Sequence, residues 1–244
     1  MNREKVLILG ASSDIGCEII SEISDDMSII LAHYNSSEKK LIHLQSELHT
    51  QIVPIKADLL DEKQLIDLIN KIRNQYSHPT KILFLAAPKI ENIRFKNINW
   101  EDYEKDLDVQ LKSSVFILKE FLPMMADEKK GKIIFMLSSY TLSVPPKALS
   151  HYITVKYALL GFMKSLASEY SEKNIQINAV SPSMVETSFL ENIPDKLVEL
   201  ASEAHPLKRN AVPHDIAPLI KFLLSEESNY ITGINIPVCG GVVS

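Results

Sequence analysis

The chain has 244 residues, a formal net charge of −5, and 45% hydrophobic against 23% charged residues. This balance excludes a disordered chain, and the length suits a single domain, which we expect to span residues 1–244. No long basic run indicates a nucleic-acid or membrane surface. No apolar run is long enough for a signal peptide or a bilayer span, so we expect a cytoplasmic protein.

The cysteines and histidines give no sign of a disulfide or a metal. Cys17 and Cys239 are far apart, without a second thiol near either, and the seven histidines are scattered. Such spacing matches neither a disulfide framework nor a zinc motif. We therefore expect no metal, and chemistry on a small molecule is favoured by elimination.

Short apolar runs alternate with longer amphipathic segments along the chain. The runs predict strands at Val6–Leu9, Ser28–Tyr34, Ile52–Ala57, Lys81–Ala87, Lys132–Leu137, Ile175–Val180 and Ile234–Val238. Their almost continuous apolarity is typical of parallel strands covered on both faces. The intervening segments predict helices near Ile15–Ile23, Glu38–Leu48, Glu62–Tyr76, Trp100–Met125, Tyr152–Tyr170 and Asp215–Leu224.

Right-handed β-α-β crossovers between these elements predict an α/β fold. We expect a Rossmann-like, doubly wound parallel sheet of seven strands with helices on both faces. Residues 183–212 show no strand pattern and contain Pro194 and Pro206, so we expect a substrate lid within this region.

A glycine-containing loop follows the first predicted strand and opens the first predicted helix. It reads Gly10-Ala11-Ser12-Ser13-Asp14-Ile15-Gly16. Backbone N–H groups and the helix dipole at such a place can hold a pyrophosphate; the alternative is a tight turn that binds nothing. Two unit charges ~4 Å apart repel by about 4 kcal/mol at an effective dielectric of 20. We therefore expect Asp14 to point away from the phosphates while it caps the helix.

Ser139, Tyr152 and Lys156 form a second group with chemical meaning. Ser139 ends a predicted strand, Tyr152 follows thirteen residues later, and Lys156 lies one helical turn further on. Tyr and Lys at this spacing share one helix face. There an ammonium can lower the phenol pKa, ordinarily about 10, and make the phenol a general acid for a ketone. On an exposed helix the same pair would be only a solvated face.

The order of these parts resembles the short-chain dehydrogenase/reductase family over nearly the whole chain. The segments that carry the resemblance are Gly10 to Gly16, Ala57-Asp58-Leu59, Ser138-Ser139, Tyr152 to Lys156, Asn178-Ala179-Val180-Ser181-Pro182 and Tyr230-Ile231-Thr232-Gly233. The resemblance implies that Ser139 orients a substrate carbonyl and that Tyr152 transfers the proton. It also implies that Lys156 lowers the tyrosine pKa and binds the nicotinamide ribose, and that Gln110 occupies the family's fourth catalytic position, usually Asn.

The resemblance further implies a cofactor cradle at the ends of the strands. Asp58 and Leu59 would contact adenine, and Val185 and Thr187 would contact the nicotinamide amide. The residues expected to bind the cofactor are Gly10, Ser12, Ser13, Asp14, Ile15, Gly16, Tyr34, Asn35, Ser36, Asp58, Leu59, Ala86, Ala87, Tyr152, Lys156, Pro182, Val185 and Thr187.

The cofactor is predicted to be NADP(H), with NAD(H) as the alternative. The segment His33-Tyr34-Asn35-Ser36-Ser37 lacks the acidic residue that would bind a free ribose 2′-hydroxyl. Its neutral donors, with Lys39 and Lys40 nearby, could accept a 2′-phosphate. An ordinary polar turn at the start of a helix would have the same composition.

The chain also departs from the family pattern. Asp14 and Gln110 replace Gly and Asn, Ser183 replaces Gly, and Leu85-Ala86-Ala87-Pro88 stands where the family has Asn-Asn-Ala-Gly. These changes concern the cofactor cradle and leave the Ser-Tyr-Lys set intact, which favours an active enzyme.

The predicted activity is that of an NADP(H)-dependent ketoreductase similar to the 3-oxoacyl-acyl-carrier-protein reductases, acting on a free or carrier-linked carbonyl compound. Two alternatives stay open. One is an alcohol or sugar dehydrogenase of a biosynthetic pathway, and the other is a non-catalytic dinucleotide-binding regulatory protein. The resemblance implies a homotetramer, which agrees with the general prevalence of symmetric assemblies.

Overall fold

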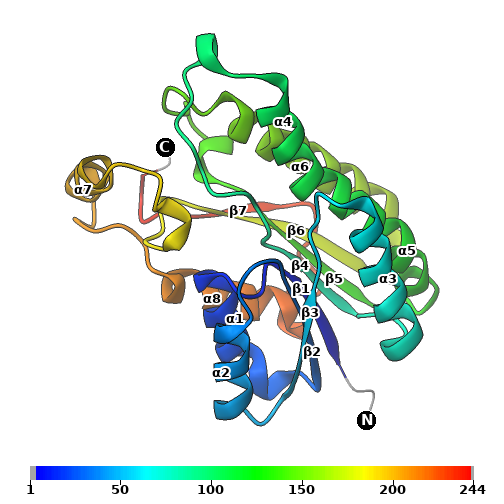
Figure 1. The fold of residues 1–244 in the computed structure, drawn as a ribbon. Helices are drawn as coiled ribbons and strands as arrows, with labels where there is room; N and C mark the ends of the chain where they lie inside the picture. The colour runs from blue at the N-terminus through cyan, green and yellow to red at the C-terminus, as the bar shows by residue number, and fades with distance from the viewer. Residues whose placement is uncertain (1–3, 243–244) are drawn as a thin grey trace.

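Seven parallel strands form the centre of the protein, whose computed structural model describes residues 4–242. The strands are β1 Lys5–Leu9, β2 Ile29–Tyr34, β3 Gln51–Lys56, β4 Lys81–Phe84, β5 Gly131–Met136, β6 Ile175–Pro182 and β7 Asn235–Val238. They lie in the order β3-β2-β1-β4-β5-β6-β7 (Figure 1). The direction of winding reverses between β1 and β4, which confirms the predicted doubly wound sheet.

Helices cover both faces of this sheet. On one face lie α1 Asp14–Ile23, α2 Lys39–Glu47 and α8 Pro213–Leu224. On the other lie α3 Glu62–Tyr76, α4 Trp100–Leu107, α5 Ser113–Asp127 and α6 Ser150–Tyr170 (Figure 1). The remaining helix, α7 Asp195–Ala204, stands away from the sheet.

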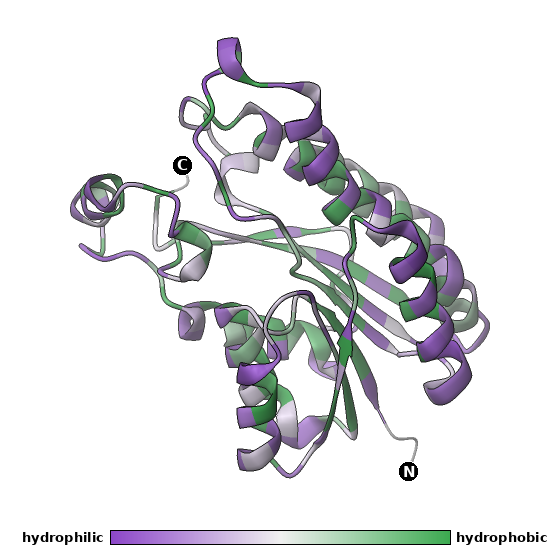
Figure 2. Ribbon diagram, viewed as in Figure 1, coloured by the Kyte–Doolittle hydropathy of each residue, from purple (hydrophilic) through white to green (hydrophobic). Residues whose placement is uncertain are grey.

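Burial on both faces explains why the strand sequences are apolar without alternation. In β1, Leu7 and Leu9 pack into the core under α3, α5 and α6, whereas Val6 and Ile8 pack into the core under α1 and α8. All four side chains are at most 1% exposed. Figure 2 shows the same division, with apolar strands between helices whose outer faces are hydrophilic. Such a sheet is held by two separate apolar layers.

The helix expected over Trp100–Met125 is interrupted in the structure. A π-helical turn, Asp108–Lys112, separates α4 from α5. At this turn the Ser114 hydroxyl donates to the main-chain carbonyl of Gln110. A π-helical turn accommodates one additional residue in a helix and often lies at a functional site. The continuous helix was therefore a wrong prediction, and the interruption places Gln110 inward.

The region expected to hold the lid contains structure that the sequence pattern did not predict. Helix α7 lies within it, and a single bridge between Val185 and Ala211 ties its two ends together. The expected absence of a strand is otherwise correct for these residues. Among residues 4–242, no helix is both long and apolar enough to cross a membrane.

Candidate active site

A large cavity opens at the carboxyl ends of the strands. Its volume is about 1610 Å³, whereas pockets for one small ligand usually measure about 300–1,000 Å³. A dinucleotide and a second molecule can therefore share it. Its position matches the crevice outside the carboxyl edge of a doubly wound sheet, where the winding reverses.

Most of the predicted cofactor residues lie on the cavity wall. They are Gly10, Ser12, Ser13, Asp14, Ile15, Asn35, Ser36, Asp58, Leu59, Ala86, Ala87, Tyr152, Lys156, Pro182, Val185 and Thr187. Gly16, Tyr34, Ser139 and Gln110 do not lie on this wall. Tyr34 is buried in the apolar core under α1 and α2 instead, so the structure does not support a cofactor contact for it.

The glycines of the first loop allow the backbone to come close to its neighbours. Gly10 has φ +83°, and a Cβ atom there would lie 2.8 Å from the backbone nitrogen of Ala86. At Gly16 a Cβ atom would lie 2.6 Å from the carbonyl oxygen of Ala11. Glycine is needed for backbone conformation at the first position and for helix packing at the second. Gly16 thus shapes the loop from behind the wall.

Asp14 is the first residue of α1, and the expectation that it caps this helix is wrong. The cap is Ser13, whose hydroxyl accepts from the Gly16 N–H at 3.0 Å. The Asp14 carboxylate instead accepts from the backbone N–H and the hydroxyl of Ser188, at 2.7 and 2.8 Å, and pairs with Lys40. Burial opposes ionisation, but these hydrogen bonds outweigh it and hold the Asp14 pKa below its usual range. Two groups of the cavity wall, Lys40 and Ser188, therefore satisfy the carboxylate.

His33 stabilises the cofactor cradle through hydrogen bonds that the sequence did not predict. Its Nδ1 accepts from the Gly10 N–H at 3.1 Å, and its Nε2 lies 3.0 Å from the Ala57 carbonyl oxygen. Burial lowers its pKa to about 4, so the ring is neutral at pH 7. A neutral ring that accepts at Nδ1 must donate at Nε2. His33 therefore links the ends of β1 and β3 across β2, and its place at the end of a cavity-lining strand was the only sequence signal.

Tyr152 and Lys156 lie together on the cavity side of α6. The Lys156 Nζ atom is 5.4 Å from the centroid of the Tyr152 ring and donates to the Met136 carbonyl at 2.8 Å. The side chains are 8% and 4% exposed, respectively. Such burial excludes the alternative that the pair is a solvated helix face.

The pKa of Tyr152 differs from the expectation. Burial raises it above its ordinary value, and a hydrogen bond with the Ser138 side chain offsets only part of this rise. Burial also lowers the pKa of Lys156 to about 8, although the charge of Asp106 opposes that change. The predicted lowering of the tyrosine pKa by Lys156 is not found, because burial destabilises both charged forms.

The structure places Ser138, and not Ser139, against Tyr152. Ser138 lies on the cavity wall with Tyr152 and lowers the tyrosine pKa, whereas Ser139 is 3% exposed and lies off the wall. The two serines differ because the chain turns into a 3₁₀ turn, Ser139–Thr141, directly after Ser138. The spacing to Tyr152 along the sequence had instead favoured the hydroxyl of Ser139.

The remaining part of the cavity extends from Tyr152 toward α7. Its apolar wall includes Ile90, Leu149, Phe189, Ile193 and Leu197. The Phe189 and Tyr152 rings lie 6.3 Å apart between centroids. An apolar compartment beside a phenol is suited to a carbonyl compound with a hydrocarbon portion.

The sequence predicts no metal site. Within residues 4–242, no group of three or more His, Cys, Asp or Glu side chains could hold a metal ion. Cys17 and Cys239 are free thiols.

Comparison with known proteins agrees with this geometry. A family model described as enoyl-(acyl carrier protein) reductase matches residues 10–243. The 3-oxoacyl-[acyl-carrier-protein] reductase FabG of Thermotoga maritima is 28% identical over 239 residues, which cover 97% of this chain and 96% of that protein. FabG of Staphylococcus aureus (strain Mu50) is 28% identical over 244 residues, with 98% of each chain covered.

Solved structures give the same result. ElxO with NADP bound has a TM-score of 0.86 and 27% identity, with 98% of each chain covered. A Serratia marcescens short-chain dehydrogenase/reductase mutant has a TM-score of 0.88 at 21% identity, covering 99% of this chain and 98% of its own. The second likeness supports the fold alone. Because the family model covers nearly the whole chain and the cradle and Tyr-Lys pair fit it, this chain belongs to the short-chain dehydrogenase/reductase family of oxidoreductases.

Proposed function

We propose that this protein is an NADP(H)-dependent ketoreductase that converts a 3-oxoacyl-type carbonyl to an alcohol. The observation that carries the proposal is the buried Tyr152 beside Lys156, with Ser138 on the same wall, in a cavity large enough for a dinucleotide and a substrate. The FabG relatives support the substrate class.

The cradle fits a dinucleotide. At Gly10 a side chain would collide with the backbone of Ala86, so glycine lets the loop pack directly against the segment that follows β4. Asn35, Ser36, Ser37 and Lys40 line the cavity after β2, and none is acidic. Together with the NADP-bound relative ElxO, this supports NADP(H) as the cofactor, which when bound supplies the hydride that reduces the carbonyl carbon.

The chain's own residues then handle the oxygen and its proton. Ser138 and the phenol of Tyr152 donate hydrogen bonds to the carbonyl oxygen, and the tyrosine proton passes to that oxygen as negative charge develops on it. Its raised pKa keeps Tyr152 protonated before the reaction. The Lys156 ammonium, when charged, stabilises the phenolate that remains and binds the nicotinamide ribose.

Gln110 is proposed to act behind Lys156. It lines a second, small cavity of about 10 Å³ together with Met136, whose carbonyl accepts from Lys156. That volume is about the size of one water. The side chain and carbonyl of Gln110 could thus hold a water on the inner side of the lysine, as the family position implies.

The test is an assay of NADPH oxidation with purified protein. It compares a 3-oxoacyl thioester, a simple ketone, a sugar and the matching enoyl thioester, the last because the family model is described as an enoyl reductase. Turnover of the 3-oxoacyl thioester with at least a tenfold preference for NADPH over NADH in kcat/KM is expected. Turnover of only the enoyl thioester or the sugar would replace the proposed substrate class. NADPH binding without any turnover would favour the regulatory alternative.

The two neighbouring serines provide a matched control. Ser138→Ala is expected to lower kcat by about 10²-fold, a usual loss when one donor to a developing oxyanion is removed. Ser139→Ala should leave kcat within about threefold. The reverse order would return the role to Ser139.

We also propose that the chain assembles as a homotetramer and that residues 183–212 close over the substrate. Helices α4 to α6 present one side for pairing, as the family resemblance implies (Figure 1). Light scattering tests the first proposal, and a single species near 27.5 kDa would exclude it. Limited proteolysis tests the second, since cleavage within α7 should slow when NADPH and substrate are both present.

A further inference from the structure

A cluster of buried polar side chains lies behind the Tyr152–Lys156 pair. It consists of Asp106 at the end of α4, Gln110 in the π-helical turn and His151 in the first turn of α6. Their exposures are 5%, 4% and 5%, respectively. Because charged and amide side chains are rarely buried to this degree without a partner, the cluster needs an explanation.

The contacts inside the cluster converge on the carboxylate. Gln110 Nε2 donates to Asp106 Oδ1 at 3.3 Å, and His151 Nε2 lies 4.0 Å from Asp106 Oδ2. The ring of Tyr103 meets the His151 ring edge-on, and its hydroxyl donates to Ser150 at 2.9 Å. Both carboxylate oxygens therefore face polar groups, and the surrounding helices hold the geometry.

Hydrogen-bonding capacity is nevertheless left over. Among the described residues, His151 Nδ1 and Gln110 Oε1 are buried side-chain atoms without a hydrogen-bond partner. Stability alone favours full satisfaction of buried polar atoms, since each unsatisfied group costs about 1–3 kcal/mol in a typical protein. A cluster with leftover capacity next to reacting groups is more typical of a functional site than of a structural one.

Gln110 and Met136 line one small cavity, and this cavity connects the cluster to a charged group, Lys156. Its ammonium donates to a neutral acceptor, the Met136 carbonyl. The charge of Asp106 nevertheless acts on it and opposes the lowering of its pKa by burial. The effect is mutual, because Lys156 and His151 both counteract the rise that burial causes in the pKa of Asp106.

Other charged groups also lie near Asp106. Lys105, beside it on α4, is exposed and acts on it more weakly than His151 or Lys156. From the π-helical turn the Gln110 amide donates to Asp106, and the charged groups of that turn, Asp108 and Lys112, pair with each other at 3.8 Å. On α6, the groups near Asp106 are His151, Lys156 and Tyr152. The Asp106 charge raises the pKa of Tyr152.

We propose that Asp106, held by Gln110 and His151, is a positioning residue whose buried carboxylate keeps the Lys156 ammonium charged during the reaction. This inference rests on the proposed function, because it assigns Lys156 a charged state that a reductase needs. Without the carboxylate, burial would favour the neutral amine. As pH rises, the phenolate of Tyr152 and the cofactor ribose would then lose their cationic partner at a lower pH than in the wild type.

The direction of the effect follows from these charges. In the wild type, reduction should decline as pH rises through about 8, where Lys156 loses its proton. In Asp106→Asn the midpoint of this decline should lie about one pH unit lower, the size of shift that an opposite charge nearby usually produces. The Tyr152 pKa should fall as well, but it starts above its ordinary value, so the lysine determines the profile.

The experiment measures two pH profiles between pH 5.5 and pH 9.5, chosen to bracket the lysine pKa of about 8. One is kcat/KM for ketone reduction, and the other is the Kd for NADPH, followed by nicotinamide fluorescence. The matched control is Asp108→Asn, which removes a half-buried carboxylate two residues away that faces Lys112. Asp106→Ser is the second neutral variant, and normal NADPH binding at low pH identifies folded protein.

A midpoint about one unit lower in the Asp106 variants, and unchanged in Asp108→Asn, is the expected result. Profiles of the Asp106 variants that coincide with the wild type, or an equal shift in Asp108→Asn, would overturn the inference. If the wild type reduces no carbonyl compound, the proposed function fails. The NADPH-binding profile would still test Asp106 in that case, because the ribose contact of Lys156 depends on the same proton.

Discussion

Strand β5 separates two buried lysines that have the same altered pKa and different surroundings. Lys132 is the second residue of β5, and Lys156 donates to the carbonyl of Met136, the last residue of that strand. The side chains of Lys132 and Lys156 are 7% and 4% exposed. Burial lowers the pKa of each lysine to about 8. One lysine lies at the amino edge of the sheet and the other at its carboxyl edge.

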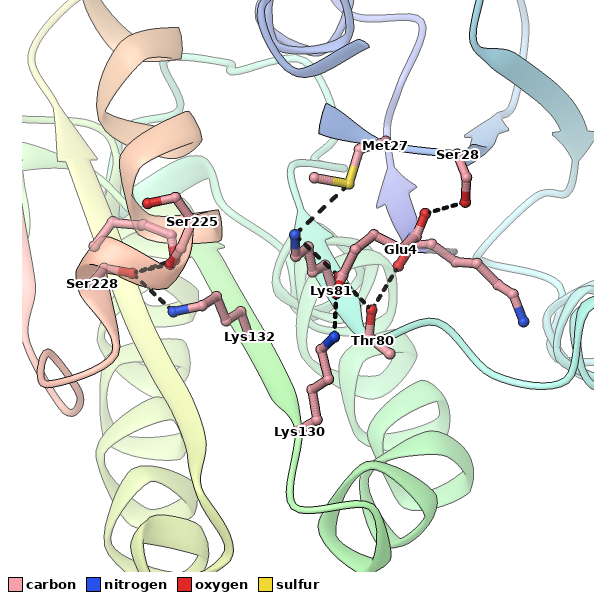
Figure 3. A network of polar contacts seen from close by, with 11 residues as sticks. Glu4, Met27, Ser28, Thr80, Lys81, Lys130, Lys132, Ser225 and Ser228 are labelled. Carbon is pink, nitrogen blue, oxygen red and sulfur yellow. Dashed lines mark hydrogen bonds and ion pairs between the residues drawn. The ribbon is translucent and has the colours of Figure 1, made fainter. Parts of the chain in front are cut away.

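At the amino edge, the polar side chains form hydrogen bonds and ion pairs with one another. Lys132 donates to the Ser228 hydroxyl at 2.9 Å, and nearby Glu4 pairs with both Lys81 and Lys130 (Figure 3). Thr80 donates to the same carboxylate at 3.0 Å, as the dashed line in Figure 3 marks. This network ties the start of the chain to β4 and β5.

At the carboxyl edge, the corresponding groups face open space. Lys156 and Tyr152 line the cavity of about 1610 Å³, and Ser138 lies beside them. A lowered lysine pKa therefore indicates burial and does not by itself identify a reactive site. What distinguishes the two lysines is the neighbouring phenol and the cavity that both groups border.

Among the variants considered, Tyr152→Phe should have the largest effect on the reaction. It removes the proton donor and keeps the ring, so kcat should fall by ~10²–10⁴-fold, the usual range for general acid catalysis. NADPH titration should give a Kd within about threefold of the wild type, because the cradle is unchanged. A variant that keeps more than about a third of the wild-type kcat would place the proton donor elsewhere.

Lys156→Met and Lys132→Met compare the two lysines directly. Lys156→Met should lower kcat/KM by about 10²-fold, since it removes both the charge beside Tyr152 and the ribose contact. Lys132→Met should leave kcat/KM within about threefold. Equal losses in the two variants would mean that the amino edge takes part in the reaction.

The same Lys132 variant has a predicted effect on stability. The folded-state pKa of Lys132 lies below its ordinary value of 10.5, so protonating it in the folded protein is unfavourable. That penalty is fully present below about pH 8 and disappears as pH rises through 10.5. Lys132→Met should therefore gain most in Tm, relative to the wild type, at neutral pH. A Tm difference that does not shrink toward alkaline pH would contradict this.

Glu4→Gln should lower stability without changing the reaction. It leaves Lys81 and Lys130 without their carboxylate partner and should cost on the order of 1 kcal/mol. Burial is outweighed by these lysines, so the Glu4 pKa lies below its ordinary value of 4.5. Its contribution is present above that value and is lost as pH falls below it. Urea unfolding should therefore separate wild type and variant less at pH 3.5 than at pH 7, with equal kcat.

Gln110→Asn should have the smallest effect. The amide is kept and one methylene is lost, and the main-chain carbonyl of residue 110 is available in either variant. We expect kcat to change by less than about tenfold, equivalent to ~1.4 kcal/mol of barrier. A large gain in kcat would show that Gln110 holds the water behind Lys156 poorly, and would favour the regulatory alternative.

Much of the fold could be read from the sequence, because buried parallel strands leave a signal in composition alone. The predicted strand at Ile175–Val180 lies within β6, and the helix Glu62–Tyr76 has the observed bounds. The Tyr152–Lys156 pair was also accessible, since residues four apart on a helix must share a face. Local spacing determines these features, and no distant contact changes them.

Features that depend on contacts between distant segments were decided only by the tertiary structure. Spacing selected Ser139, but the 3₁₀ turn after β5 directs Ser138 to the phenol. Asp14 was expected to cap its own helix, and it instead binds Ser188, which is 174 residues away. The burial that raises the Tyr152 pKa arises from packing of separate elements around α6. The sequence therefore determined which groups this protein carries at the ends of its strands, and packing determined which of them meet, because hydrogen bonds and desolvation depend on distance in space.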